Sequence, residues 1–153
     1  MPFKEPFTLG PFIVDSEGSL SPAHPGVSPG FSVRWRGRVV HARLDHSVGH
    51  AGHLHIQSGL GRIPSTASDP VTRAACLAML QGLLSALPDT WSARLLPDHQ
   101  PQLEVESTVA LPITVTNLVV ELTLFLLSLS PYLDLMDQAG VRTVSPDLRV
   151  AAW

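Results

Sequence analysis

The chain has 153 residues, of which 44% are hydrophobic and 15% charged, and its formal net charge is −3. This length suits one domain of roughly 100–200 residues, and the low charge together with the high apolar share argues against an intrinsically disordered chain. The acidic balance excludes a generally basic nucleic-acid binder, and a single cysteine excludes both an internal disulfide framework and a cysteine-rich zinc module. Because the first residues show no basic segment followed by an apolar one, we expect no secretory signal and a cytoplasmic location.

The first thirty residues are expected to form an arm that is distinct from the core. The runs PFIV and SLS flank the segment DSEG, whose Gly18 suits the turn of a short hairpin. The following residues 21–30, SPAHPGVSPG, contain three prolines and two glycines and therefore predict a loop. We thus expect a single domain over residues 1–153, with arm and loop at 1–30, core at 31–140 and tail at 141–153.

The strongest local pattern is a hairpin around Arg36-Gly37. Apolar and polar residues alternate in FSVRW and RVVHARL, as in an antiparallel sheet with one wet face, and the glycine supplies the positive φ that tight hairpins favour. A two-residue turn predicts these opposed pairs: Trp35 with Arg38, Val33 with Val40, and Phe31 with Ala42. The register places Arg34, His41 and Arg43 on the wet face. A third strand is expected to follow near His53.

A helix and a second hairpin are expected next. Asp69 can cap a helix that starts at Pro70 and ends before Pro88. Alternation with a period of two residues then predicts strands at 91–96 and 102–111, joined by a five-residue loop at 97–101. That loop predicts these opposed pairs: Leu95 with Leu103, Ala93 with Val105, and Arg94 with Glu104.

The last element is a long apolar helix that starts near Thr114 or Thr116, is kinked or restarted at Pro131 and ends at Gly140. Its window 111–129 contains one charge, Glu121, so a membrane span has to be considered. A charged side chain at mid-membrane costs about 2.5–3.5 kcal/mol, and no Lys or Arg flanks the window. We therefore expect a helix buried within the protein or in a dimer, and no membrane span.

Together these elements predict an α+β fold. Its antiparallel sheet follows the order β-β-β-α-β-β-α, with an extra N-terminal hairpin and two long apolar helices packed on the sheet. The absence of alternating strands and helices argues against a nucleotide-binding α/β fold.

Five of the seven histidines lie between residues 41 and 55. In an extended chain His53 and His55 share a face and could converge with His46 or His50 on a metal, and neutral imidazoles suit zinc, nickel or copper. No cysteine or acidic partner stands at a recognised spacing, so surface histidines on a polar loop are the competing interpretation. A small-ligand or metal-binding function of the His46–His55 loop is the second hypothesis, and no cofactor is expected.

Arginines cluster on the first core hairpin. Arg34, Arg36 and Arg43 could together contact an anion or an acidic peptide. The competing interpretation is the solvated face of a half-covered sheet, which carries charged side chains in any case.

Sequence signatures of catalysis are missing. The chain has no GxSxG nucleophile elbow, no P-loop and no GxGxxG fingerprint. Cys76 stands among Ala and Leu residues, where a small buried hydrophobe is the expected role. We therefore expect no enzymatic activity.

Four segments from residue 31 onward carry a family likeness. They are the strands ending at LGRIP, the helix RAACLAMLQGLLSALP, the hairpin WSARLLPDHQPQLEVEST and the helix NLVVELTLFLLSLSPYLDLMDQ. In order and hydrophobicity, over residues 31–138, they resemble the superfamily of type III secretion chaperones and YbjN-like proteins, although secretion chaperones begin with a helix and this chain begins with a strand-like segment. The resemblance implies a bacterial, cytoplasmic, non-enzymatic homodimer that binds protein segments as a chaperone or regulator.

The two helices carry more apolar surface than one sheet can cover. Nine of the twelve residues at 118–129 are large and apolar, so they nearly encircle a helix. Monomers rarely expose apolar patches larger than a few hundred Å², and a twofold homodimer is the commonest way to cover one. The expected contact residues are Leu77, Leu80, Leu84, Leu124 and Leu127.

Overall fold

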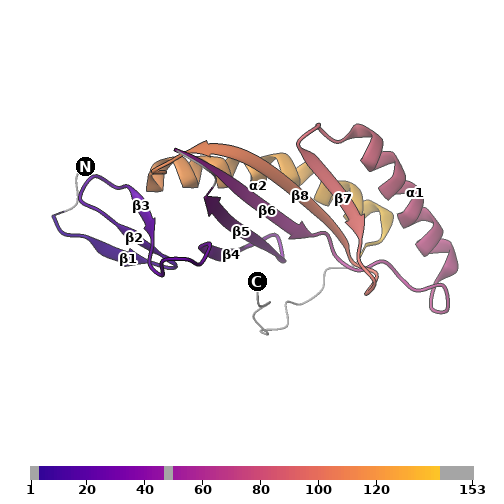
Figure 1. Ribbon diagram of the computed structural model, residues 1–153. Coiled ribbons are helices and arrows are strands. Elements are labelled where there is room, and N and C mark those ends of the chain that lie inside the picture. Colours follow the sequence, from indigo (N-terminus) through magenta and orange to yellow (C-terminus); the bar gives the residue numbers. More distant parts are fainter. Residues whose placement is uncertain (1–3, 47–49, 142–153) are drawn as a thin grey trace.

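The structure is a computed structural model that describes residues 4–46 and 50–141. It contains two helices and antiparallel sheets, so the expected α+β class is confirmed (Figure 1). The tail expected at 141–153 lies, apart from its first residue, outside the described residues.

A five-stranded antiparallel sheet forms the centre of the protein, in the spatial order β4-β5-β6-β8-β7. Along the chain, three of its strands are followed by a helix, two more strands and a second helix. The elements of this part are β4 (Gly30–Trp35), β5 (Arg38–His46), β6 (Ala51–Gly59), α1 (Pro70–Ala86), β7 (Trp91–Leu95), β8 (Pro101–Ala110) and α2 (Val115–Ala139). Because β6 pairs with β8, the two hairpins join into one sheet.

The β4–β5 hairpin has the predicted register. Its opposed pairs include Trp35 with Arg38, Val33 with Val40, and Phe31 with Ala42. The turn takes a positive φ at both Arg36 (49°) and Gly37 (76°), which is the geometry of the two-residue turns that match the twist of a hairpin. As predicted, Arg34 is therefore exposed on the outer face of the sheet, while the apolar side chains of β4 face inward.

The β7–β8 hairpin differs from its predicted register by two residues. The observed pairs are Leu95 with Pro101, Ala93 with Leu103, and Arg94 with Gln102. The loop closes earlier than expected, because Leu96 N–H donates to Gln100 O at 2.9 Å and His99 takes a φ of 66°. A shift of two residues keeps each side chain on its predicted face, so the inward and outward sets are unchanged.

The N-terminal arm contains the expected hairpin, with Gly18 at positive φ in its turn, and one further strand extends it to a small three-stranded sheet. Its strands are β1 (Phe7–Leu9), β2 (Phe12–Val14) and β3 (Leu20–Pro22). Main-chain bonds join it to the start of α2: Leu20 N–H donates to Ile113 O at 2.8 Å, and Val115 N–H donates to Gly18 O at 3.0 Å. Its buried side chains belong to the same hydrophobic core as those of the large sheet.

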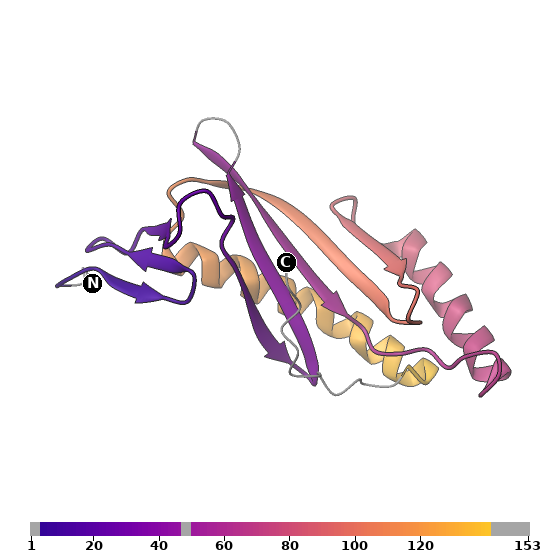
Figure 2. The same cartoon turned by 60° about the horizontal axis from the view of Figure 1, so that its bottom comes forward.

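α2 lies across the inner face of the sheet, and α1 lies beside the C-terminal half of α2 at the β7 end (Figures 1 and 2). Thr114 caps α2 by accepting from Asn117 N–H, and Gly140 ends it with a φ of 90°. The helix continues through Pro131, so it does not restart there. Both helices were expected on the sheet, but α1 packs against α2, where Cys76 Sγ donates to Ala139 O at 3.3 Å.

The core lies between the sheet and α2. Leu54 and Leu103 from the sheet are fully buried, as are Leu129 and Leu133 from the helix. Trp91 at the start of β7 stacks on an aromatic ring of α2, Phe125, with ring centroids 5.0 Å apart. In the described part of the chain no helix covers the opposite face of the sheet, which is polar (Figure 2).

Candidate functional site

The outer face of α2 carries a continuous apolar stripe. Toward the sheet, the helix buries Leu118, Phe125, Leu129, Leu133 and Met136. On the opposite side, at spacings of three and four residues, it exposes Val120, Leu124, Leu127, Pro131 and Leu135. Residues at these spacings lie along one side of a helix, as they do at a coiled-coil seam. Leu124 and Leu127, at its centre, are 55% and 60% exposed.

Of the five leucines expected at a subunit contact, three are exposed, one is partly buried and one is buried. Leu84 is exposed, like the two leucines at the centre of α2. Leu80 is buried and Leu77 packs against the core, because α1 uses this side within its own subunit. Leu80 is therefore not available at the surface, and the other four candidates stay predictions. The sequence did not single out the other members of the stripe, which are Val120, Pro131 and Leu135, because α2 is apolar over nearly its whole circumference and spacing alone does not show which side is exposed.

By length and composition alone, α2 is also able to cross a membrane. A core helix of a globular protein meets the same criterion, so this property is weak support for a span. The helix contains Glu121, Asp134 and Asp137 but no Lys or Arg. The expectation of no membrane span therefore stays a prediction.

The arginines predicted to share an anion site point in different directions. Arg36 projects from the β4–β5 turn toward α2, where its guanidinium lies 2.6 Å from Asp134. Arg43 lies on the outer face of the sheet and donates to Asp45 from both Nε and Nη2, at 3.1 and 3.0 Å. Arg34 is exposed on the edge strand β4. The three groups thus do not converge, and the expected anion or acidic-peptide site is corrected to separate contacts.

Arg38, which belongs to the same arginine-rich hairpin and was expected opposite Trp35, contacts the end of α2. Its side chain is 5% exposed and donates to Asp137 Oδ1 at 2.7 Å. Two further bonds go to the main-chain oxygens of Arg36 at 2.9 Å and Leu60 at 3.3 Å. Arg36 and Arg38 thus connect the β4–β5 turn to the last turns of α2 through ion pairs.

The histidines of the expected metal loop lie mostly on strands. His46 ends β5, His50 directly precedes β6, and His53 and His55 face outward from β6, while residues 47–49 lie outside the described ones. Within residues 4–46 and 50–141, no three His, Cys, Asp or Glu side chains are grouped so that they could hold a metal ion. The metal hypothesis therefore gains no support from this part of the chain.

The outward histidines of β6 lie beside carboxylates. His53 Nδ1 is 3.0 Å from Glu106 Oε1, but the orientation does not make a hydrogen bond. His55 Nε2 is 3.2 Å from Asp45 Oδ2, and its Nδ1 is 3.7 Å from Glu106 Oε2. These contacts link the three neighbouring strands β5, β6 and β8 on their outer face.

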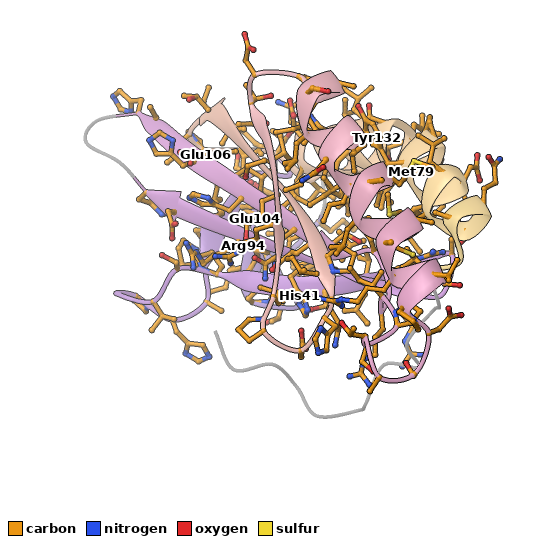
Figure 3. The ribbon with its side chains drawn as sticks, turned by 90° about the vertical axis from the view of Figure 1, so that its right-hand side faces the viewer. His41, Met79, Arg94, Glu104, Glu106 and Tyr132 are labelled. Carbon is orange, nitrogen blue, oxygen red and sulfur yellow. The ribbon has the colours of Figure 1, made fainter. Side chains whose placement is uncertain are left out.

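Two polar rows run across the strands on this outer face. The strand pairing aligns the first row, which consists of Arg43, His55 and Glu106. It also aligns the second row, which consists of His41, Gln57, Glu104 and Ser92. Figure 3 shows Glu106, Glu104 and Arg94 in succession along this face, away from Met79 of α1 and Tyr132 of α2.

A pocket of about 270 Å³ opens between these rows. Its polar lining includes Arg43, His55, Gln57, Ser92, Glu104 and Glu106. Pockets for drug-sized ligands and cofactors usually have about 300–1,000 Å³. This one therefore suits a single side chain or a small fragment better than a nucleotide.

Burial shifts the pKa values of two groups that do not line the pocket. Partial burial lowers the pKa of His41, whose Nδ1 lies 2.7 Å from Ser32 Oγ, which favours the neutral imidazole. Burial, followed by the nearby Asp69 carboxylate, raises the pKa of the Cys76 thiol. The thiolate is therefore disfavoured, as is typical of a structural cysteine.

Asp45→Asn should destabilise the protein at neutral pH and have no effect in strong acid. Burial by itself raises the pKa of Asp45, but hydrogen bonds from Ser28 and Arg43 outweigh it, and the net pKa lies below the usual 3.8. A lowered pKa in the folded state stabilises the fold above pH 3.8, and this contribution is lost as the pH falls through the folded-state pKa. At pH 7 we expect the free energy of unfolding, measured in urea, to fall by about 0.5–1 kcal/mol, as for the loss of a partly exposed ion pair. A pH-independent cost would contradict this account, and Glu17→Gln, in an exposed turn, serves as the control.

Comparisons of the chain with protein-family models, with curated proteins and with solved structures give no match.

Proposed function

We propose that the protein is a non-enzymatic protein-binding module that works as a twofold homodimer, with the outer face of α2 as the subunit interface. The observation that carries this proposal is the stripe from Val120 to Leu135, exposed along the helix opposite its buried face. Single exposed leucines are common on monomers, but a contiguous apolar stripe on a long helix marks an interaction surface.

A second copy of the chain fits this stripe better than a lipid surface does. Helices that lie on membranes carry Lys and Arg on their polar side, which attract anionic headgroups. α2 has no basic residue, and the charged residues that it does have are acidic. A second copy of the chain, related by a twofold axis, presents the same uncharged stripe, so no like charges face each other at the centre of the contact.

The size of the stripe predicts a dimer of low affinity. The stripe spans the 16 residues from Val120 to Leu135, which is about 24 Å of a helix about 10 Å wide, so it covers on the order of 250 Å² per subunit. Stable interfaces bury about 800 Å² per partner, so the stripe alone supports a weak and reversible dimer.

Sedimentation equilibrium at 1–100 μM tests the proposal. We expect a reversible monomer–dimer equilibrium with twice the 16.5 kDa chain mass at the upper end. A single species of 16.5 kDa over the whole range would contradict it. If the protein instead floats with neutral lipid vesicles and stays monomeric in their absence, the stripe binds lipid and the homodimer is refuted.

The chaperone- or regulator-like role is part of this proposal. It is supported by the resemblance to secretion chaperones and YbjN-like proteins, and by the order of three strands, helix, two strands and helix from β4 onward. On the same resemblance we propose a cytoplasmic location and a bacterial origin.

A further inference from the structure

The pocket on the outer face of the sheet has an acidic half and a basic half. Glu104 and Glu106 are two residues apart on β8, so both point outward on the same face. Gln57 of β6 and Ser92 of β7 lie directly opposite Glu104 on either side. The acidic half thus combines two carboxylates with neutral side chains that can accept hydrogen bonds.

The basic half of the pocket is already neutralised. Arg43 donates two hydrogen bonds to Asp45, so that carboxylate balances its charge. Among the described residues, the lining itself carries two carboxylates, Glu104 and Glu106, and one arginine, Arg43, whose charge is balanced by Asp45 beside the pocket. An anionic guest would meet net repulsion here, whereas a cationic guest would not.

One guanidinium group already binds at the rim of the acidic half. Arg94 Nη2 lies 2.9 Å from Glu104 Oε1, and the Arg94 side chain is 62% exposed. Because so exposed an ion pair contributes only about 0–1 kcal/mol, an incoming cation can displace it at little cost. Glu106 is 53% exposed, and its neighbours across the strand are imidazoles rather than permanently charged groups.

We propose that this pocket receives a basic side chain, an arginine or lysine, from a partner polypeptide. The inference rests on the proposed protein-binding function and names the chemistry of its partner. A guanidinium offers up to five donors in a plane, which matches two carboxylates flanked by an amide and a hydroxyl. The pocket volume of about 270 Å³ is that of a side-chain subsite, so the rest of the partner would lie along the open polar face of the sheet.

Titration of the protein with a blocked arginine peptide, acetyl-glycyl-arginyl-glycinamide, followed by ¹H–¹⁵N NMR, tests this inference. We expect saturable shifts at the amides of residues 55–57 and 104–106, with a Kd on the order of 1 mM at low salt, because one charge-assisted contact is being measured. The citrulline counterpart keeps the shape of arginine but lacks its charge and should cause no saturable shift. Equal binding of the citrulline peptide, or no shift with the arginine peptide, would overturn the inference.

A double variant and a matched control assign the binding to the pocket. Glu104→Gln with Glu106→Gln should raise the Kd at least about tenfold, since it removes both carboxylates and keeps the side-chain shapes. Glu5→Gln with Glu17→Gln makes the same change in net charge at two exposed N-terminal positions and should leave the Kd unchanged. If both double variants weaken binding equally, the attraction is general and the pocket is not the site.

The result of the arginine-peptide test can be distinguished from the result of the dimer test. Sedimentation of the Glu104/Glu106 double variant should still show the dimer, because the pocket and the stripe on α2 lie on opposite sides of the sheet. A dimer that does not bind the arginine peptide refutes this inference alone. A monomer that binds it refutes the homodimer alone.

Discussion

Replacing both Leu124 and Leu127 by glutamate should convert the dimer into a 16.5 kDa monomer at concentrations of up to about 100 μM. Burial of one leucine contributes about 1.5–3 kcal/mol, and each substitution acts twice across a twofold interface. Since 1.4 kcal/mol corresponds to a tenfold change, we expect the dissociation constant to rise at least about 100-fold. Four carboxylates brought together near the axis add repulsion. Sedimentation equilibrium measures the change.

The matched control for this variant is Val71→Glu. Val71 is 80% exposed in the first turn of α1, away from the stripe, and an acid is favourable near a helix N-terminus. It makes the same kind of substitution and should leave both the dimer and the thermal unfolding midpoint unchanged. If the control dissociates the dimer as strongly as the double variant, α2 is not the interface. If the double variant remains a dimer, the stripe is not the interface either.

Asp137→Asn should be the most destabilising of the charge substitutions on α2. The Arg38 guanidinium is almost fully buried and has Asp137 as its carboxylate partner at 2.7 Å. Loss of the partner charge leaves a buried cation with main-chain oxygens alone, and breaking a fully buried pair costs about 3–5 kcal/mol. Asp137 itself is 47% exposed, and the asparagine can still accept a hydrogen bond. We therefore expect the free energy of unfolding, measured in urea, to fall by about 2 kcal/mol.

Asp134→Asn provides the comparison on the same helix. Asp134 also contacts an arginine, Arg36, at 2.6 Å, but its side chain is 58% exposed and that of Arg36 is 33% exposed. An exposed ion pair contributes about 0–1 kcal/mol, so this variant should lose less than half as much stability as Asp137→Asn. Equal losses at the two positions would show that burial of Arg38 does not govern the energetics of the contact.

The fold was predictable from the sequence where local chemistry sets the geometry. In the β4–β5 hairpin, Arg36-Gly37 allows positive φ at both turn residues, and alternation then determines the register. The β7–β8 loop lacks such a marker. The residue with positive φ in this loop is His99, and a histidine does not indicate such a turn in the sequence. A loop at 96–100 therefore could not be distinguished from one at 97–101, and the predicted register was wrong by two residues.

The composition of the two helices did not show which of their apolar residues lie in the core and which are exposed. α1 and α2 are both apolar over a wide arc, so their sequences did not show which side faces the core. Leu80 was predicted to be a contact residue and is buried, whereas Leu135 was not singled out and is exposed. Only the packing of α1 against the end of α2 decides between these outcomes.

The pocket depends on contacts between residues far apart in the chain. Glu104 and Glu106 looked like the ordinary wet positions of a strand, and nothing local placed Gln57 beside them. The pairing of β6 with β8 across the intervening helix brings the two together. Period-two alternation predicts the face on which a side chain lies, but it does not predict its neighbours on the next strand.

The order of the strands leaves β4 and β7 at the two borders of the sheet, each pairing with one neighbour among the described residues. Unpaired main-chain groups at such borders are templates for the addition of strands from other molecules, which leads to aggregation. Each border strand has an exposed arginine near its middle or end, Arg34 on β4 and Arg94 on β7. Bulky charges of the same sign on both borders disfavour growth of the sheet from molecule to molecule, so these arginines also protect the solubility of a chain that is otherwise low in charge.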